Sequence, residues 1–201
     1  MDKAIFFDLG NVLLFFSHEK MCRQVAEVCN LDAHHVKRAF FSEGIGEKYE
    51  RGEIDTRSVH SYFCSLAKKQ IEFFDFMDAV SNIFQPNEEI VPVLKNLKKN
   101  KVHLIVLSNT CEAHFDFAYL HYPLLHLFDD YVLSYEVKAK KPEKEIFQKA
   151  LSLVHVPKEN CFYIDDVGEY VQAASALGID SELFTTTEKL IEQLVLRKYL
   201  Y

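Results

Sequence analysis

The sequence lacks several features that indicate particular classes of protein. It contains no run approaching the ~18 apolar residues of a membrane span, no C-x-x-C pair among its five cysteines, and no H-x-x-x-H pattern among its nine histidines. It also lacks an excess of basic residues, because 23 Lys and Arg face 30 Asp and Glu, for a net charge of −7. These absences argue against a membrane protein, a disulfide or zinc scaffold, and a nucleic-acid-binding protein.

No secretory signal is visible, since Asp2 and Lys3 precede only a short apolar run that Asp8 interrupts. With scattered, reduced cysteines, this predicts a cytoplasmic protein. The 201 residues suffice for one domain, or for one domain with an insert. A bound metal ion can reverse the sign of the field inside one pocket, so a small phosphorylated molecule is compatible with the negative charge. The sequence gives no indication of the oligomeric state.

Four short apolar segments are typical of strands buried on both faces, and each ends at polar residues. They are residues 4–7, 102–107, 131–133 and 161–164, and helical patterns occupy residues 87–100, 144–154 and 169–177, the last of them closed by Gly178. This alternation predicts an α/β fold with a doubly wound, Rossmann-like parallel sheet. Such sheets bind ligands at the carboxyl ends of their strands, where the polar residues fall.

The stretch from residue 17 to residue 85 interrupts this alternation. It contains apolar residues at helical spacing and no convincing strand, and Asp55 is a suitable N-cap for one of its helices. We therefore predict an inserted helical-bundle cap at 17–85, over a core domain made of residues 1–16 and 86–201.

Four polar motifs occur in order along the predicted core. They are Asp8 in the segment FFDLGNV, Ser108 in LSN, Lys141 before Pro142, and the pair Asp165-Asp166 after Ile164. In order and spacing they resemble the four motifs of the haloacid dehalogenase (HAD) superfamily, and the resemblance covers the whole chain. With the helical insert after the first motif, the chain resembles subfamily I, which has a helical cap.

The resemblance implies an Mg²⁺-dependent phosphohydrolase that works through an aspartyl-phosphate on Asp8. By resemblance, the metal ligands are the Asp8 carboxylate, the Gly10 carbonyl and Asp166, with Asp165 holding a metal-bound water. Adjacent carboxylates repel each other unless a cation lies nearby, which fits Mg²⁺ at this pair. Ser108, Asn109 and Lys141 are expected to bind the phosphate, Lys141 by neutralising developing charge and the amides near Asn109 and Thr110 by forming an anion site.

The sequence departs from the family pattern at two positions. Most phosphatases of the superfamily carry a second Asp two residues after the nucleophile, as general acid and base, and this chain has Gly10 there. Tyr170 stands where many relatives have Asn. The DLGN loop and the cap segment 50–53, ERGE, resemble a bacterial glucose-1-phosphate phosphatase group. A substitute acid could come from the cap or from the loop after Ser108, where the polar candidates are His18, His114, Glu47 and Glu50.

Several functions are compatible with these residues. The first is a phosphatase for a sugar phosphate or another small metabolite. The second is a catalytically weak member of the fold that acts in binding or regulation, a reading suggested by Gly10 and Tyr170. A phosphomutase is less consistent, because that chemistry needs an acid and base poised for both directions. A dehalogenase has no need of Mg²⁺ and leaves Asp165-Asp166 unexplained.

Overall fold

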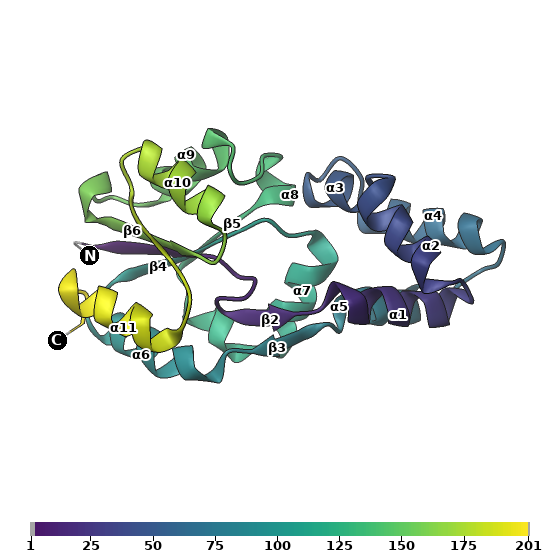
Figure 1. The fold of residues 1–201 in the computed structure, drawn as a ribbon, viewed down its shortest axis with the longest axis horizontal. Coiled ribbons are helices and arrows are strands. Elements are labelled where there is room, and N and C mark those ends of the chain that lie inside the picture. Colours follow the sequence, from purple (N-terminus) through teal and green to yellow (C-terminus); the bar gives the residue numbers. More distant parts are fainter. Residues whose placement is uncertain (1–2, 201) are drawn as a thin grey trace.

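The computed structural model describes residues 3–200, and its centre is a five-stranded sheet (Figure 1). All neighbouring strands run parallel in the order β5-β4-β1-β6-β7. The strands are β1 (Ala4–Phe7), β4 (His103–Ser108), β5 (Asp130–Leu133), β6 (Cys161–Asp165) and β7 (Asp180–Leu183). The predicted α/β fold with a parallel sheet is therefore confirmed, and four strands lie within a residue or so of their expected positions.

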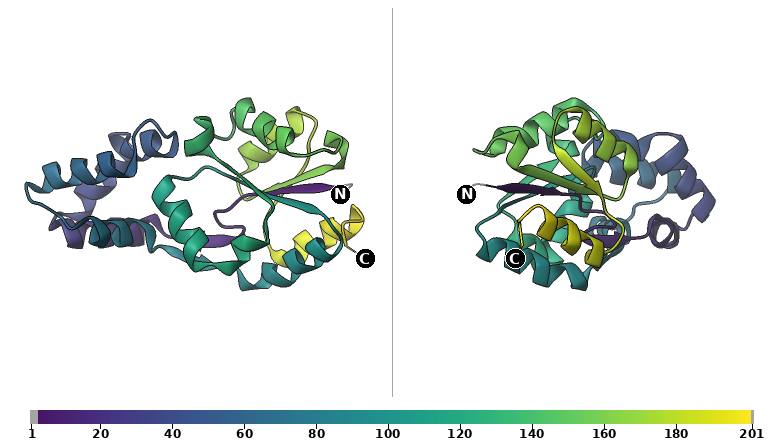
Figure 2. Two further views of the ribbon diagram at one scale, coloured as in Figure 1. Left: turned by 180° about the vertical axis from the view of Figure 1, so that it is seen from behind. Right: turned by 60° about the vertical axis from the view of Figure 1, so that its left-hand side comes forward.

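Helices cover both faces of this sheet, as Figures 1 and 2 show. One face packs on α6 (Val91–Lys99), α7 (Glu112–His121) and α11 (Thr187–Leu196), and the other on α9 (Lys144–Leu153) and α10 (Gly168–Ala176). Successive residues of β1 alternate between the two apolar clusters, with Ile5 and Phe7 in one and Ala4 and Phe6 in the other. A strand buried on both faces has no polar alternation, which is why its sequence is continuously apolar.

The edge strand β7 was not predicted from the sequence. Its residues, Asp180, Ser181, Glu182 and Leu183, are all partly or fully exposed. An edge strand is held by backbone pairing on one side only, here by β6, and can carry polar side chains. Such a segment shows neither an apolar run nor an alternation.

Five α-helices form the insert at the end of the molecule reached by the carboxyl ends of the strands (Figure 1). They are α1 (His18–Cys29), α2 (Ala33–Lys37), α3 (Ile45–Glu50), α4 (Thr56–Ala67) and α5 (Phe73–Ser81), and a π-helical turn at Arg38–Ser42 follows α2. Asp55 is the N-cap of α4, because its carboxylate accepts a hydrogen bond from the amide of Ser58 at 2.8 Å. The expected run of consecutive helices is present.

The expectation that residues 17–85 contain no strand was wrong at one end. Strand β2 (Leu14–Phe16) pairs antiparallel with β3 (Phe84–Pro86), so the chain enters and leaves the insert through a two-stranded ribbon. Each strand has three residues, which is too short to show a periodic pattern. Asn87, which follows β3, holds the start of the ribbon, because its side-chain amide donates to the carbonyl of Val12, just before β2, at 2.9 Å.

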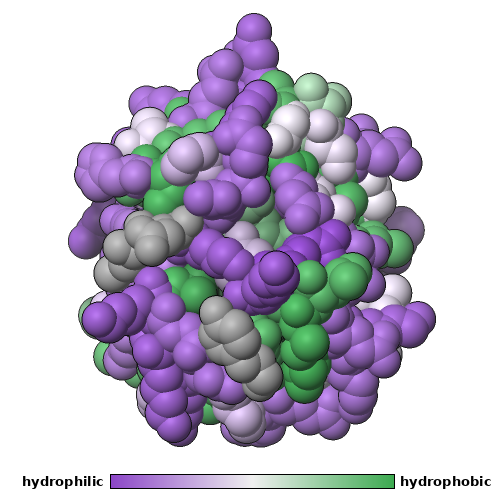
Figure 3. All heavy atoms as spheres, turned by 90° about the vertical axis from the view of Figure 1, so that its left-hand side faces the viewer, coloured by the Kyte–Doolittle hydropathy of each residue, from purple (hydrophilic) through white to green (hydrophobic). Residues whose placement is uncertain are grey.

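Short helical segments complete the described chain. They are α8 (Ser134–Val137) and the 3₁₀ turns Glu88–Ile90, Pro123–Leu127 and Lys158–Asn160. The face opposite the insert is mostly hydrophilic, with scattered apolar patches (Figure 3). Within the described residues, no helix combines the length and the apolar character that a membrane crossing requires.

Candidate active site

The four sequence motifs meet at the carboxyl ends of the central strands. Asp8 directly follows β1, Ser108 ends β4, and Asp165 ends β6 with Asp166 next to it. One carboxylate oxygen from each of Asp8, Asp165 and Asp166 lies within 4.8 Å of the others. Parallel neighbours in the sheet place these side chains at one edge, although Asp8 and Asp165 are 157 positions apart in the sequence.

Lys141 joins two members of this cluster, Asp8 and Asp165, and is almost fully buried. Its Nζ donates to Asp8 Oδ1 at 2.7 Å, to Asp165 Oδ2 at 2.6 Å and to the carbonyl of Leu107 at 3.1 Å. The three donors of the ammonium are thus used by two carboxylates and a strand carbonyl. Of the three neighbouring lysines at 138, 140 and 141, the lysine before Pro142 is the one that reaches Asp8.

Two tyrosines that the sequence did not indicate as site residues surround this ammonium. The rings of Tyr163 and Tyr170 have their centroids 5.9 and 5.2 Å from Lys141 Nζ, within the range of cation–π attraction. The hydroxyl of Tyr163 also donates to Asp165 Oδ2. Tyr170, noted in the sequence only as a departure from the family, thus forms one wall of the lysine site.

Asn109 and Ser108 have different parts in the geometry. The Asn109 side chain holds the backbone of Lys141, because Oδ1 accepts from its amide at 2.8 Å and Nδ2 donates to its carbonyl at 3.0 Å. Ser108 is buried, and within residues 3–200 its hydroxyl has no hydrogen-bond partner. The amide of Thr110 was expected to be free to bind an anion. In the structure it donates to Ser134 Oγ at 3.0 Å instead.

The two carboxylates of the Asp pair have different surroundings. Asp165 is fully buried, and besides Lys141 and Tyr163 it accepts from the amide of Val167 at 2.8 Å. Asp166 is partly exposed and accepts one hydrogen bond, from Asn11 Nδ2 at 3.0 Å. Asn11 has a left-handed backbone, with φ 55°, in the loop that follows Asp8. Asp166 therefore keeps most of its lone pairs available.

The cluster carries more negative than positive charge. Burial raises the pKa of Asp8, the carboxylates of Asp165 and Asp166 raise it further, and the ammonium of Lys141 opposes them. Three carboxylates beside one buried ammonium leave negative charge that an additional cation would neutralise. The donors are hard oxygens, the type that Mg²⁺ prefers.

Gly10 lies against an aromatic ring rather than in open space. A Cβ built on Gly10 would be 2.7 Å from Cε1 of Phe16, closer than carbon atoms approach without contact strain. Its backbone is not in the left-handed region, unlike that of Gly44, Gly52 and Gly178. Phe16, at the end of β2, thus fills the space that a side chain at position 10 would enter.

The structure separates the four candidates for a substitute acid. Glu47 and Glu50 both accept from Lys140 Nζ, at 2.6 and 2.5 Å. His114 is bonded through Nε2 to the carbonyl of Val80 at 3.1 Å, and burial lowers its pKa to about 4. Neither the ion-paired glutamates nor this neutral histidine is set up as a proton donor near neutral pH.

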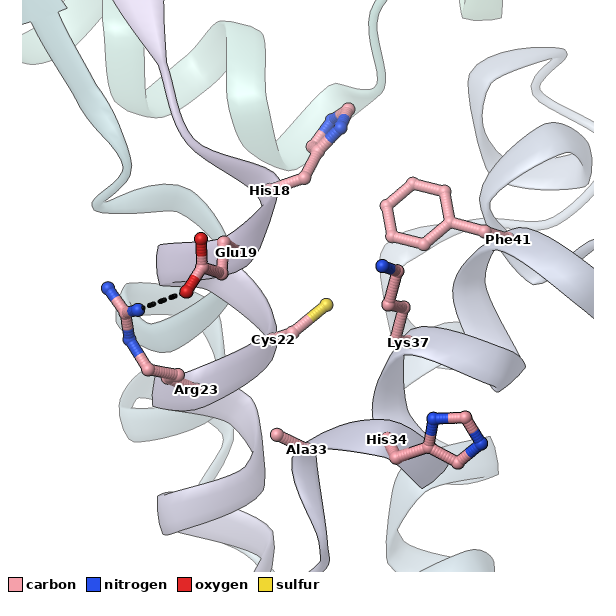
Figure 4. Close-up of a pocket in the computed structure, with 8 residues that line it drawn as sticks. All are labelled: His18, Glu19, Cys22, Arg23, Ala33, His34, Lys37 and Phe41. Carbon is pink, nitrogen blue, oxygen red and sulfur yellow. Dashed lines mark hydrogen bonds and ion pairs between the residues drawn. The ribbon is translucent and has the colours of Figure 1, made fainter.

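His18 is the remaining candidate. Its exposed ring lies between Phe16 and Phe41, with ring centroids 4.9 and 5.0 Å away, and it has no hydrogen-bond partner within residues 3–200. It borders a surface cavity of about 370 Å³ between α1 and α2, in which Phe41 and Lys37 lie across from it (Figure 4). It also borders a smaller cavity of about 30 Å³ between the insert and α7, which Glu50, Cys111 and His114 line as well.

Residues 3–178 match the family model described as haloacid dehalogenase-like hydrolase. The chain belongs to this hydrolase family. It is 23% identical over 190 residues to D-ribitol-5-phosphate phosphatase of Bacteroides thetaiotaomicron, covering 90% of this chain and 91% of that protein. It is 22% identical to a phosphatase of Mycobacterium tuberculosis, covering 90% and 86%. The resemblance read from the motifs is thereby confirmed at the level of the family.

Solved structures show the same fold. A HAD family enzyme of Bacteroides thetaiotaomicron matches with a TM-score of 0.84 at 22% identity, covering 96% of this chain and 98% of that one. The same enzyme in complex with magnesium and inorganic phosphate gives 0.81 at 23% identity, covering 93% and 96%. L-2-haloacid dehalogenase of Xanthobacter autotrophicus gives 0.63 at 16% identity, covering 99% and 87%.

Proposed function

We propose that this hydrolase is a Mg²⁺-dependent phosphomonoester phosphatase that acts on a small phosphorylated metabolite, with Asp8 as the nucleophile. The observation that carries the proposal is the convergence of Asp8, Asp165 and Asp166 beside the buried ammonium of Lys141. The phosphatases among its relatives, one of them named for D-ribitol 5-phosphate, support the same reaction class.

The residues present fit a magnesium ion. Asp8 and the partly exposed Asp166 would hold it, together with the Gly10 carbonyl, which accepts no backbone hydrogen bond within the described residues. Asp165, whose oxygens already accept from Lys141, Tyr163 and Val167, lies beside them. Magnesium, when bound, offsets the repulsion between the carboxylates and the phosphate of the substrate.

The chain's own residues account for the two chemical steps. In the first, an Asp8 oxygen forms a bond to phosphorus while the bond from phosphorus to the leaving oxygen breaks, which gives an aspartyl-phosphate. In the second, water attacks that phosphorus and releases inorganic phosphate, and Asp8 is restored. Lys141 offsets charge on Asp8 and on the phosphoryl oxygens, and the buried Ser108 hydroxyl can donate to one of those oxygens.

The substrate proposal follows from the missing acid at Gly10. Without a side chain that protonates the leaving oxygen, charge builds up on that atom, and better leaving groups react faster. A sugar 1-phosphate has a better leaving group than a sugar 6-phosphate, which is consistent with the resemblance to glucose-1-phosphate phosphatases. D-ribitol 5-phosphate, named for one relative, is an ordinary alkyl phosphate and is the natural comparison compound.

The domain boundaries belong to this proposal too. We divide the chain into a core of residues 1–16 and 86–201 and a cap of residues 17–85 that covers the carboxyl ends of the strands. The cap meets the core where α5 packs on α7, where α3 packs on α8, and at the small cavity that His18 and Glu50 line. We further propose a cytoplasmic location, in line with the free thiols of all five cysteines.

The proposal is tested by measuring phosphate release from a panel of phosphomonoesters, with Mg²⁺ and with a chelator. Asp8→Asn removes the nucleophilic charge at nearly constant volume, so turnover should vanish while circular dichroism and the unfolding midpoint show a folded protein. Phosphate release by the folded Asp8→Asn protein would overturn the role of Asp8. Magnesium-independent release by the native protein would overturn the metal requirement.

One observation favours a second function. Phe16 fills the space beside Gly10, so the core has no side chain at the position of the usual acid. A catalytically weak protein that binds phosphorylated ligands would share this feature. The same panel separates the two readings, because a binding protein would show saturable, Mg²⁺-dependent binding of a phosphate ester in calorimetry with no phosphate released.

A further inference from the structure

The loop that carries Lys141 has two sides with different contacts. Lys141 points into the core, to Asp8 and Asp165, while its neighbour Lys140 contacts helix α3 of the insert and Glu143 contacts Arg51, the residue after that helix. Figures 1 and 2 show α3 beside this part of the core, next to α8. Residues one and two positions from the buried lysine thus form one part of the contact between insert and core, which we call the seam.

Ion pairs connect the two sides of this seam. Lys140 Nζ lies 2.6 Å from Glu47 Oε2 and 2.5 Å from Glu50 Oε2. The guanidinium of Arg51 lies 2.5 Å from Glu143 Oε1 and also contacts Glu47 at 2.6 Å. Glu143 in turn accepts from the amide of Lys140 at 3.2 Å, so the pairs form one network with the loop backbone.

Backbone packing brings α3 against the core at the same place. The hydroxyl of Ser134 lies 2.7 Å from the carbonyl of Glu50 and 2.9 Å from that of Thr110, two residues after Ser108. A Cβ on Gly52 would be 2.0 Å from the carbonyl oxygen of Tyr135, so only glycine allows this approach. The end of α3 therefore rests on the loops that carry both Ser108 and Lys141.

We propose that Glu50, Arg51 and Gly52 are positioning residues, which hold the Lys141 loop in its working place when the insert is docked on the core. The proposal rests on the proposed function, because it assigns Lys141 a part in turnover. Asn109 fixes the Lys141 backbone from the core side, and the α3 network fixes its neighbours from the other side. Movement of the insert away from the core would therefore also move the loop that carries Lys141.

The network gives a structural role to the cap segment 50–53, for which the sequence showed only a resemblance to a phosphatase group. The ERGE segment at residues 50–53 supplies a carboxylate, a guanidinium and a glycine, and each meets the core at a different point of the seam. The side chains are partly exposed, so each ion pair is weak and is screened by salt. The glycine contact has no such dependence on salt.

Two glycines provide a matched test of docking. Gly52 and Gly44 both have positive φ, +63° and +79°, and lie on either side of α3. A Cβ on Gly44 meets nothing within 4 Å, whereas one on Gly52 meets Tyr135. Gly44→Ala and Gly52→Ala therefore carry the same type of backbone strain, and only the second separates α3 from the core.

Two readouts are compared between these variants and the native protein. The first is kcat and KM for the best phosphomonoester of the panel at saturating Mg²⁺. The second is the rate at which an amine-acetylating reagent modifies Lys141, measured by mass spectrometry of peptides. This readout does not depend on turnover. Gly52→Ala should lower kcat and accelerate Lys141 modification, and Gly44→Ala should leave both near the native values.

The outcomes separate this inference from the proposed function. Equal Lys141 modification in the two glycine variants would overturn the positioning role, whatever the activity. A rise in KM with unchanged kcat would also overturn it, because docking would then affect binding alone. If the native protein lacks phosphatase activity but Lys141 is exposed only in Gly52→Ala, the proposed function fails while the coupling stands.

A double-mutant cycle tests the ion pairs. Arg51→Gln and Glu143→Gln should each lower kcat by about two- to fivefold, the range for exposed pairs, and the double variant should be no worse than either single one. Arg38→Gln is the control, since Arg38 pairs with Glu43 inside the insert at 2.9 Å. Additive effects of the two changes, or an equal loss in Arg38→Gln, would contradict coupling through this pair.

Discussion

The ring of Phe16 stands 2.7 Å from the point where a Cβ on Gly10 would lie. The side-chain position that carries the acid in most phosphatases of the family is therefore closed by an aromatic ring. The His18 ring packs against the same Phe16 ring, at a centroid distance of 4.9 Å. The absence of an acid at position 10 and the packing of β2 are therefore linked, because Phe16 of β2 occupies the space that an acidic side chain would need.

The first prediction concerns leaving groups. With no acid at Gly10, the first chemical step should depend steeply on the acidity of the departing alcohol. General acid catalysis is worth ~10²–10⁴ in rate, so aryl phosphates and sugar 1-phosphates should exceed alkyl phosphates by a margin of that order. The measurement is kcat/KM across phosphate esters of graded leaving-group acidity at saturating Mg²⁺.

The structure supplies the variants that check this reading. Gly10→Asp alone should disturb the loop because its Cβ meets the Phe16 ring, whereas Gly10→Asp combined with Phe16→Ala has space for the carboxyl group. The double variant should show a flatter dependence on leaving group than Phe16→Ala alone. An equally steep profile in those two proteins would show that position 10 does not reach the leaving oxygen.

The second prediction concerns His18. If the native profile is flat, His18 is the candidate that the structure leaves, because Glu47, Glu50 and His114 are engaged elsewhere. His18→Gln should then lower kcat/KM for alkyl phosphates by about 10²-fold or more and spare aryl phosphates. An equal loss for both substrate types would point to a role in binding instead.

The third prediction separates the two members of the Asp pair. Asp166→Ala should raise the Mg²⁺ concentration needed for half-maximal activity more than Asp165→Ala does, because the partly exposed Asp166 is the one proposed to hold the metal. Asp165→Ala should mainly lower the free energy of unfolding, since removing one partner of a buried ion pair typically costs about 3–5 kcal/mol. Magnesium titrations and urea unfolding of both variants decide this, and identical titration curves would contradict it.

The fourth prediction concerns pH and His114. Burial and the nearby His18 lower its pKa from 6.5 to about 4, so the unfolded chain binds the proton more readily between these values. Stability from the neutral ring is present above pH 6.5 and is lost as the pH falls toward 4. His114→Gln retains a donor for the Val80 carbonyl and should flatten the decline in unfolding free energy over this range. Parallel curves for native and variant protein would refute it.

The sequence predicted the fold wherever burial leaves a pattern. Strand β1 is apolar throughout because both of its faces are covered, and the predicted bounds, residues 4–7, are those of the structure, Ala4–Phe7. Strands β2 and β3 were missed, because three residues of ribbon carry no period. Edge strand β7 was missed because its side chains are partly or fully exposed.

The sequence pattern pointed to those site residues that lie at the end of a strand or directly after it. Asp8, Ser108 and Asp165 were noted because they follow strands, but their site roles, like the choice of Lys141 before Pro142, came from the resemblance to the family motifs. Tyr163 was missed, because an aromatic residue inside an apolar strand looks like core, and its hydroxyl contact with Asp165 depends on tertiary structure. The network of Arg51, Lys140 and Glu143 was missed for a related reason, since charged residues on helices and loops usually face solvent.

The burial of Cys111 has a practical consequence. This thiol lines the small cavity between the insert and α7, and burial raises its pKa, so it is unreactive while the two parts are in contact. Cys29 and Cys161, by contrast, are enclosed within the insert and within the core. The rate at which Cys111 is alkylated in the native state therefore reports how often the two parts separate, and Cys29 and Cys161 are internal references that are modified only when the insert or the core itself unfolds.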